Sequence, residues 1–253
     1  MDCWLNLGIT GGCCWPTEDK KILFGGHEFL LKPATRETEQ SIHINISKEK
    51  MSRIDAMTLV NRFLSIISWC DGGNGGMDII YDIGVSNVAP IAIPMRRRML
   101  GSSIDFPFYR DIEKNHKASL ALALYREGLV TDSVPLSFLS FFKIINIFYN
   151  DKTTRVNKQK PQNELIASLG SLLQHIKCDL ATKRIDELKK SVNDIPKYLY
   201  ERRCAIAHAF VDPTIDPDNV AESRDLSQDT WIIRAIADYL IEKKLNVSKS
   251  ILG

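Results

Sequence analysis

The chain has 253 residues, of which 44% are hydrophobic and 25% are charged, and its formal net charge is +2. This composition is typical of a soluble globular protein, and the length suits one large domain or two small ones. A charge balance this close to zero does not indicate a general nucleic-acid-binding surface, so any basic surface must be local.

The first hundred residues predict a small β-rich domain with one helix. A strand is expected near 4–9, and two short apolar runs on either side of Gly25 and Gly26 predict a hairpin. Residues 41–47 alternate strictly between polar and apolar side chains, with three isoleucines on one face. His43 falls on the opposite, polar face, where we expect it to be solvated.

The hydrophobic period then changes to that of a helix. Ser52 with Asp55 resembles a capping box, and apolar residues follow at helical spacing to about Cys70. The glycine-rich residues 71–76 follow this helix and precede a strand-like run at 77–83. Because the stretch lacks the Gly-Lys-Ser/Thr ending of a phosphate-binding loop, it predicts a turn.

One more strand is expected at 86–93, and three arginines at 96–98 then mark a linker that is either solvated or in contact with phosphate. We therefore divide the chain into a β-rich domain, 1–100, and an all-helical domain, 101–253. The fold class predicted is α+β. Helices are expected at 112–126, 134–149, 163–176, 180–188, 194–210 and 230–244.

Several features argue against a membrane, an export signal or a metal. No apolar stretch approaches the roughly 20 residues of a membrane span. The N-terminus lacks the basic start and apolar run of a signal peptide, so a cytoplasmic protein is expected. The six cysteines show no Cys-x-x-Cys spacing and no finger-like arrangement with histidine. We expect free thiols, no metal and no cofactor.

One segment, 200–210, carries residues suited to chemistry. It holds Arg203, four intervening residues and His208, and two upstream stretches, 119–128 and 135–145, accompany it. Together these features resemble the HEPN-domain family, with its Arg-x4–6-His motif. The resemblance is to bacterial members with a β-rich N-terminal region, including ones associated with methylamine utilisation.

The resemblance covers roughly 100–245 and implies a helical bundle that acts as a ribonuclease, often as a homodimer. Histidine can transfer a proton near neutral pH, and arginine can clamp phosphate oxygens. His208 would be the acid or base and Arg203 the phosphate ligand, while Arg202, with five intervening residues, would assist. The predicted function is a metal-independent endoribonuclease, the effector of a toxin–antitoxin or antiphage system, with RNA and an antitoxin or defence protein as partners.

Helix geometry leaves the arrangement of the motif open. At about 100° per residue, Arg203 lies about 140° from His208, and Arg202 about 120° away on the other side. A bend, the long arginine side chains or a second protomer must then complete the site. Cys204 stands where active family members usually carry Asn, Asp or His, and a thiol orients an imidazole poorly. Glu201 is a more distant substitute.

Two alternatives to catalysis therefore stay open. The domain can be a non-catalytic HEPN module that uses Arg203 and His208 to bind RNA or a partner protein. The same two residues can also be purely structural, because arginine and histidine near a helix end cap carbonyls or pair with aspartate.

Overall fold

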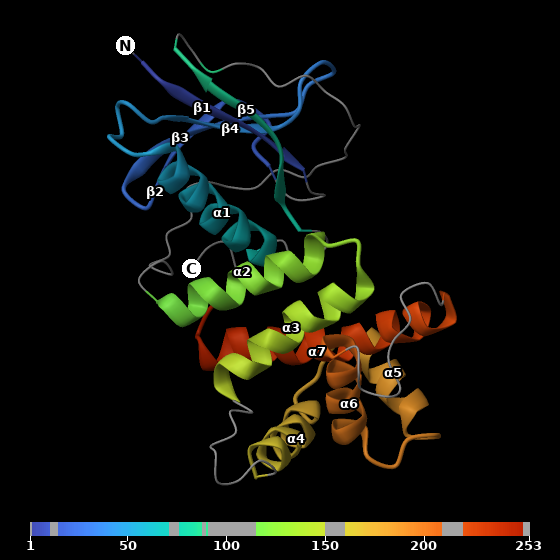
Figure 1. Ribbon diagram of the computed structural model, residues 1–253. Helices are drawn as coiled ribbons and strands as arrows, with labels where there is room; N and C mark the ends of the chain where they lie inside the picture. The colour runs from blue at the N-terminus through green and yellow to red at the C-terminus, as the bar shows by residue number, and fades with distance from the viewer. Residues whose placement is uncertain are drawn as a thin grey trace. The chain divides into compact units, whose positions relative to one another are not determined.

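The computed structural model describes residues 2–10, 15–70, 76–87, 90, 115–149, 160–208 and 220–249. These ranges contain five strands and seven helices (Figure 1). The chain divides into two compact units, which we call the N-terminal unit (Met1–Val130 with Ser248–Gly253) and the C-terminal unit (Thr131–Val247). The predicted α+β class, with an antiparallel sheet followed by helices, is confirmed. The predicted domain boundary near residue 100 lies outside the described residues.

An antiparallel sheet with the strand order β2-β3-β4-β1-β5 forms the N-terminal unit together with two helices. The strands are β1 (Trp4–Thr10), β2 (Lys20–Phe24), β3 (His27–Lys32), β4 (Ser41–Asn45) and β5 (Asp78–Ser86). The hairpin predicted around Gly25 and Gly26 is confirmed. Both glycines have positive φ, 58° and 82°, as a tight two-residue hairpin turn requires.

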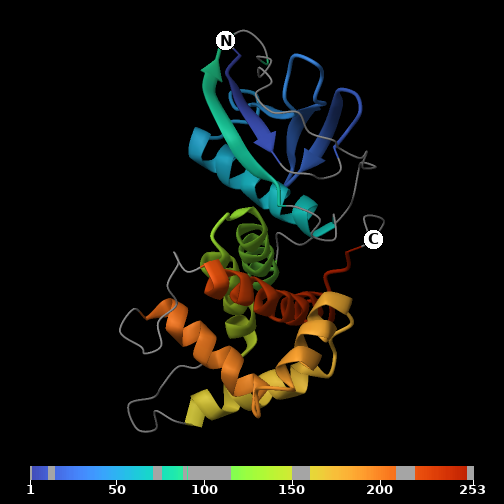
Figure 2. The same ribbon diagram turned by 90° about the vertical axis from the view of Figure 1, so that its right-hand side faces the viewer.

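The helix α1 (Arg53–Cys70) covers one face of this sheet (Figure 2). It begins where the capping box was predicted: the Asp55 N–H donates to Ser52 Oγ (3.1 Å), and that hydroxyl donates to the Asp55 carboxylate (2.7 Å). Phe63 packs edge-on against Phe24 and Phe29, with ring centroids 5.3 Å and 5.6 Å away. Burial of these aromatic rings anchors the helix to the sheet.

His43, on the sheet face opposite α1, is not solvated as predicted. The three isoleucines of 41–47 are buried as expected, but His43 is also fully buried. Its Nε2 lies 2.8 Å from Ser41 Oγ and its Nδ1 lies 2.8 Å from Asn6 Oδ1. The expectation of a solvated histidine is wrong, because the polar residues of β4 pair with those of β1 instead of facing water.

The strand predicted at 77–83 is confirmed as β5, which extends to Ser86. Most of the second predicted strand, 86–93, lies outside the described part of the chain, as do the arginines 96–98 and most of the glycine-rich stretch. The last residue of that stretch, Gly76, packs too closely against its neighbours to carry a side chain. A Cβ there would lie 2.3 Å from Val130 Cγ1, so no larger residue fits without displacement.

The helix α2 (His116–Val130) packs against α1. The Trp69 and Tyr125 rings meet edge-on at 5.0 Å, and the indole N–H donates to the Ser248 carbonyl (3.1 Å). Ser248 is therefore held against α1. On α2, Ala121 is buried, whereas its neighbour Leu120 is exposed.

The C-terminal unit consists of five helices. They are α3 (Val134–Phe148), α4 (Lys160–Leu173), α5 (Asp179–Leu188), α6 (Ile195–Ala207) and α7 (Val220–Lys244). The long helix α7 packs against both α3 and α5. It begins at Val220 rather than at the predicted residue 230, because its first turns carry acidic residues that interrupt the apolar pattern used to recognise a helix.

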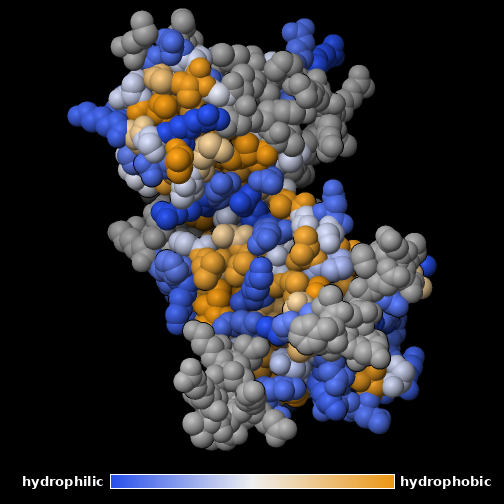
Figure 3. All heavy atoms as spheres, in the orientation of Figure 1, coloured by the Kyte–Doolittle hydropathy of each residue, from blue (hydrophilic) through white to orange (hydrophobic). Residues whose placement is uncertain are grey.

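Exposed large apolar side chains are scattered over both units and include Leu23, Ile54, Leu136 and Leu180. On the face drawn in Figure 3, hydrophobic residues are interspersed with hydrophilic ones. Single exposed apolar side chains of this kind are normal for a protein surface. None of the helices in the described ranges combines the length and the apolar character that crossing a bilayer demands.

Candidate functional site

The motif lies at the end of α6, a helix whose start is set by sequence. The Asp194 carboxylate accepts a hydrogen bond from the Lys197 N–H (3.0 Å), and Pro196 occupies the first turn, where its missing N–H costs nothing. The helix ends at Ala207, and His208 is the C-cap residue. The His208 N–H still donates to the Cys204 carbonyl (3.0 Å). His208 therefore sits on the last closed turn.

The predicted extension of this helix to Phe210 is wrong at its end. His208 has extended backbone angles, φ −132° and ψ 103°, so the chain leaves the helix there. The rotation angles expected between His208 and the arginines consequently do not apply, because they assume a helical His208. The sequence contains no signal for the end of α6 at Ala207, since alanine favours helix and no glycine follows to terminate it.

The side chains of the motif differ in exposure. Arg203 and Cys204 are half-buried, whereas Glu201 and His208 are exposed. Arg203 Nη1 lies 3.9 Å from Cys204 Sγ, a weak contact between neighbours. Glu201 Oε1 lies 3.7 Å from Lys197 Nζ, one turn earlier on α6. Glu201 thus pairs with Lys197 on the exposed surface of the helix, and the Cys204 sulfur accepts a weak contact from Arg203.

Arg202 has a different environment from Arg203. Its Nε donates to the Tyr198 hydroxyl (2.9 Å) and to Asp229 Oδ2 (3.2 Å), and its Nη2 donates to Asp225. The guanidinium also lies over the Tyr198 ring, 5.1 Å from its centroid. These contacts bind α6 to α7, so the charge of Arg202 is balanced within the fold.

Arg184 on α5 completes this charged cluster. Its Nε donates to Asp229 Oδ1 (2.8 Å) and its Nη2 to Asp225 Oδ1 (2.6 Å). Tyr198 donates its hydroxyl proton to Asp229 Oδ2 (2.8 Å). We call Arg184, Tyr198, Arg202, Asp225 and Asp229 the carboxylate cluster. The two aspartates hold three helices together, and the carboxylate of Asp229 is fully buried between two arginines.

Burial governs ionisation within the carboxylate cluster. It raises the pKa of Tyr198 to about 12, and the negative charge of Asp229 acts in the same direction. Tyr198 therefore stays protonated and remains a hydrogen-bond donor at neutral pH. Burial also raises the pKa of Asp229, and the hydrogen bonds from Arg184 and Tyr198 oppose that rise.

Sequence reasoning missed four members of this cluster, although a partial signal existed. Asp225 and Asp229 are four residues apart, as are Tyr198 and Arg202, so each pair shares a helix face. What the sequence does not reveal is that these faces meet. Among the residues that the structure describes, no three His, Cys, Asp or Glu side chains gather as metal ligands.

The chain is similar to one known family over its helical part. A family model described as methylamine utilization protein MauJ matches residues 121–242, slightly under half of the chain. The matched range includes α3 to α6, most of α7, the whole motif and the carboxylate cluster. The expected resemblance to methylamine-utilisation-associated proteins is thereby confirmed, and the assignment to HEPN domains stays a prediction. No curated protein and no solved structure matches the chain.

Proposed function

We propose that the C-terminal unit is a metal-independent endoribonuclease in which His208 transfers protons and Arg203 binds the scissile phosphate. We extend the proposal, on the HEPN resemblance alone, to an effector of a toxin–antitoxin or antiphage system. The observation that supports the chemistry best is the position of His208, which is exposed where α6 ends, together with half-buried Arg203 beside Cys204 on the last turns of the same helix. Arg202 belongs instead to the carboxylate cluster.

The proposed reaction is a transesterification within RNA. The 2′-oxygen attacks the adjacent phosphorus and loses its proton to an imidazole, while the P–O5′ bond breaks and the 5′-oxygen gains a proton. The products are a 2′,3′-cyclic phosphate and a 5′-hydroxyl. Arg203 would stabilise the negative charge that develops on the phosphoryl oxygens.

A homodimer is part of this proposal. The reaction needs one group that accepts a proton and one that donates a proton, and each copy of the motif carries a single histidine, His208. Two copies of the motif in one cleft would supply both groups. Binding of RNA by a non-catalytic module is the alternative that the following experiment distinguishes.

The test is cleavage of RNA by the full chain in the presence of EDTA, followed by analysis of the product ends. We expect 2′,3′-cyclic phosphate ends. We expect His208→Ala to lose about 10²–10⁴-fold in rate, which is the usual contribution of a general acid or base. His116→Ala, which removes an exposed histidine on α2, is the matched control and should cleave like wild type.

Two outcomes would count against the proposal. Equal rates for wild type and His208→Ala would show that any cleavage does not use this residue. Absence of cleavage, together with RNA binding that Arg203→Ala weakens and His116→Ala does not, would establish the non-catalytic module instead.

A further inference from the structure

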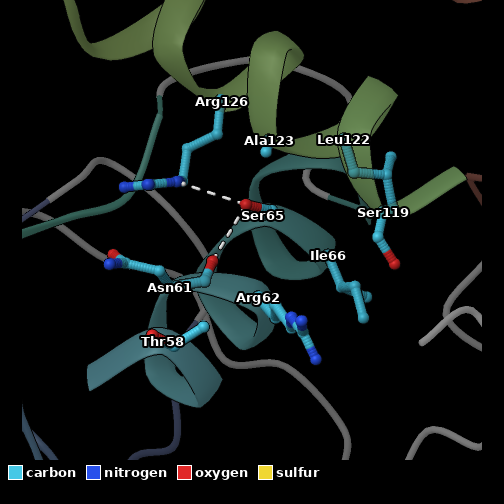
Figure 4. A pocket seen from close by; sticks show the side chains of 9 residues that line it. All are labelled: Thr58, Asn61, Arg62, Ser65, Ile66, Ser119, Leu122, Ala123 and Arg126. Atoms are coloured by element: carbon cyan, nitrogen blue, oxygen red, sulfur yellow. Dashed lines mark hydrogen bonds between the residues drawn. The ribbon is translucent and has the colours of Figure 1, made fainter. Parts of the chain in front are cut away.

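The N-terminal unit contains a pocket of about 230 Å³ between α1 and α2, separate from the motif (Figure 4). Residues at helical spacing line it from both sides. Asn61, Ser65 and Ile66 come from α1, and Leu122 and Ala123 come from α2. The space exists because small side chains face each other there: Ser65 turns its hydroxyl back to the Asn61 carbonyl (2.9 Å), and Ala123 adds only a methyl group.

The charges of the lining favour an anion. Two arginines, Arg62 and Arg126, contribute to the pocket, and none of its described lining residues is acidic. Arg126 reaches across from α2, where its Nε donates to Ser65 Oγ (3.3 Å) and its Nη1 to Asp78 (2.6 Å). Asp78 therefore balances the charge of Arg126. Within the described ranges, exposed Arg62 has no carboxylate partner, so one positive charge at the pocket is unbalanced.

The remaining lining divides into polar and apolar parts. Ile66 and Leu122 are almost completely buried and form apolar walls, whereas Asn61 is half-buried beside Arg62. No hydrogen bond joins the Asn61 side-chain amide to any other described residue, and the amide can donate to a ligand oxygen. A ligand would therefore place an apolar body between the helices and its charged end toward Arg62.

We propose that this pocket binds a small organic carboxylate with a compact apolar body. A single unbalanced arginine matches a single negative charge, whereas a phosphate dianion would carry an excess charge into an apolar space. The volume lies below the roughly 300–1,000 Å³ of sites for drug-sized ligands, so the body must be small. The two arginines differ in role. Arg62 binds the carboxylate, whereas Arg126 fixes α2 against α1 and β5 through its hydrogen bonds to Ser65 and Asp78.

The experiment titrates the full chain with benzoate at constant ionic strength and follows binding by ligand-detected NMR. Benzamide, which has the same shape without the charge, is the reference ligand. For a ligand of this size we expect a Kd on the order of 1 mM for benzoate and at least tenfold weaker binding of benzamide.

Two substitutions assign the binding to this pocket. Arg62→Gln should weaken the binding of benzoate about tenfold, because it removes a hydrogen bond to a charged group. Its control, Arg53→Gln, removes an exposed arginine of the same helix and should leave the affinity for benzoate unchanged. Ala123→Phe should abolish binding by filling the space. Its control, Leu120→Phe, adds bulk at an exposed position of α2 outside the pocket.

Ala123 is exposed, so its replacement by phenylalanine should leave the fold intact, which circular dichroism and the unfolding midpoint would check. The inference is overturned by a wild-type chain that does not bind benzoate at concentrations well above 10 mM, by equal affinities for benzoate and benzamide, or by a folded Ala123→Phe variant that binds like wild type. The ribonuclease proposal is independent of each of these results.

Discussion

At the scale of single residues, His43 is a titratable group held entirely inside the protein. It is fully buried in the sheet, and both ring nitrogens lie within hydrogen-bonding distance of Ser41 and Asn6. Burial lowers the pKa of His43 to about 4, and the positive charge of Lys32 acts in the same direction, while Asp19 opposes it. The folded protein therefore holds this imidazole neutral at physiological pH.

This ionisation makes stability depend on pH in a defined window. An unfolded histidine takes up a proton near pH 6.5, whereas His43 in the folded chain does so only near pH 4. Between these values the unfolded state binds more protons, so the free energy of unfolding should fall as pH is lowered, by up to about 1.4 kcal/mol per pH unit from this group. Urea unfolding at several pH values measures the slope.

The matched variants are His43→Gln and His116→Gln. The first should be less stable at neutral pH but lose this contribution to the slope, and the second, at an exposed histidine, should keep it. An unchanged slope in a folded His43→Gln variant would show that His43 is not responsible.

At the scale of elements, the position of α6 depends on the carboxylate cluster. Asp229 receives hydrogen bonds from residues on α5 and α6, and none of its contacts can be replaced by water without opening the helix interface. The pair Lys197–Glu201 on the same helix is exposed, and its side chains are 3.7 Å apart. Because water screens an exposed pair, only the buried contacts should hold α6 in place.

We expect Arg202→Met to lower the free energy of unfolding by about 2 kcal/mol, since it removes one of two arginines from a buried carboxylate and leaves the other in place. Lys197→Met, which breaks the exposed pair of the same helix, should have little effect. Chemical denaturation followed by helical circular dichroism measures both. Equal effects of the two substitutions would contradict the structural role assigned to Asp229.

At the scale of the whole molecule, the chain combines a sheet-containing unit with a helical one, and the described residues of each unit form a hydrophobic core. Trp69, Tyr125 and Phe63 lie in the N-terminal unit, whereas Phe138, Phe141 and Leu240 lie in the C-terminal unit. The match to the MauJ family model ends before the C-terminus and begins within α2. The sheet, and most of the residues that line the pocket between α1 and α2, therefore belong to the part of the chain that the family model does not cover.

The proposed ribonuclease requires a homodimer, and we expect light scattering to give the mass of two chains at micromolar concentration. A two-fold axis would bring two copies of α6 together, because a self-complementary surface pairs each residue with its equivalent. A wild-type chain that cleaves RNA as a monomer would show that one copy of His208 suffices, and a monomer without activity would argue against the catalytic reading.

The sequence by itself determined the elements whose signals are local. Strict alternation predicted β4, Ser52 with Asp55 predicted the start of α1, and Gly25 with Gly26 predicted the hairpin, because each depends on neighbours within a few residues. The motif residues could be picked out in the same way, although the end of α6 at Ala207 could not. Alanine continues a helix as readily as any residue, so the sequence contains no stop there.

Only the tertiary structure decided which faces meet. Alternation assigns His43 to one side of a strand, but burial of that side depends on what else packs there. Arg202 and Arg203 are adjacent and chemically alike, and no local pattern indicates that Asp225 and Asp229 approach Arg202 from α7. The pocket likewise exists only because α1 and α2 pack with small residues opposed. Such contacts join residues far apart in the chain, and no local pattern specifies them.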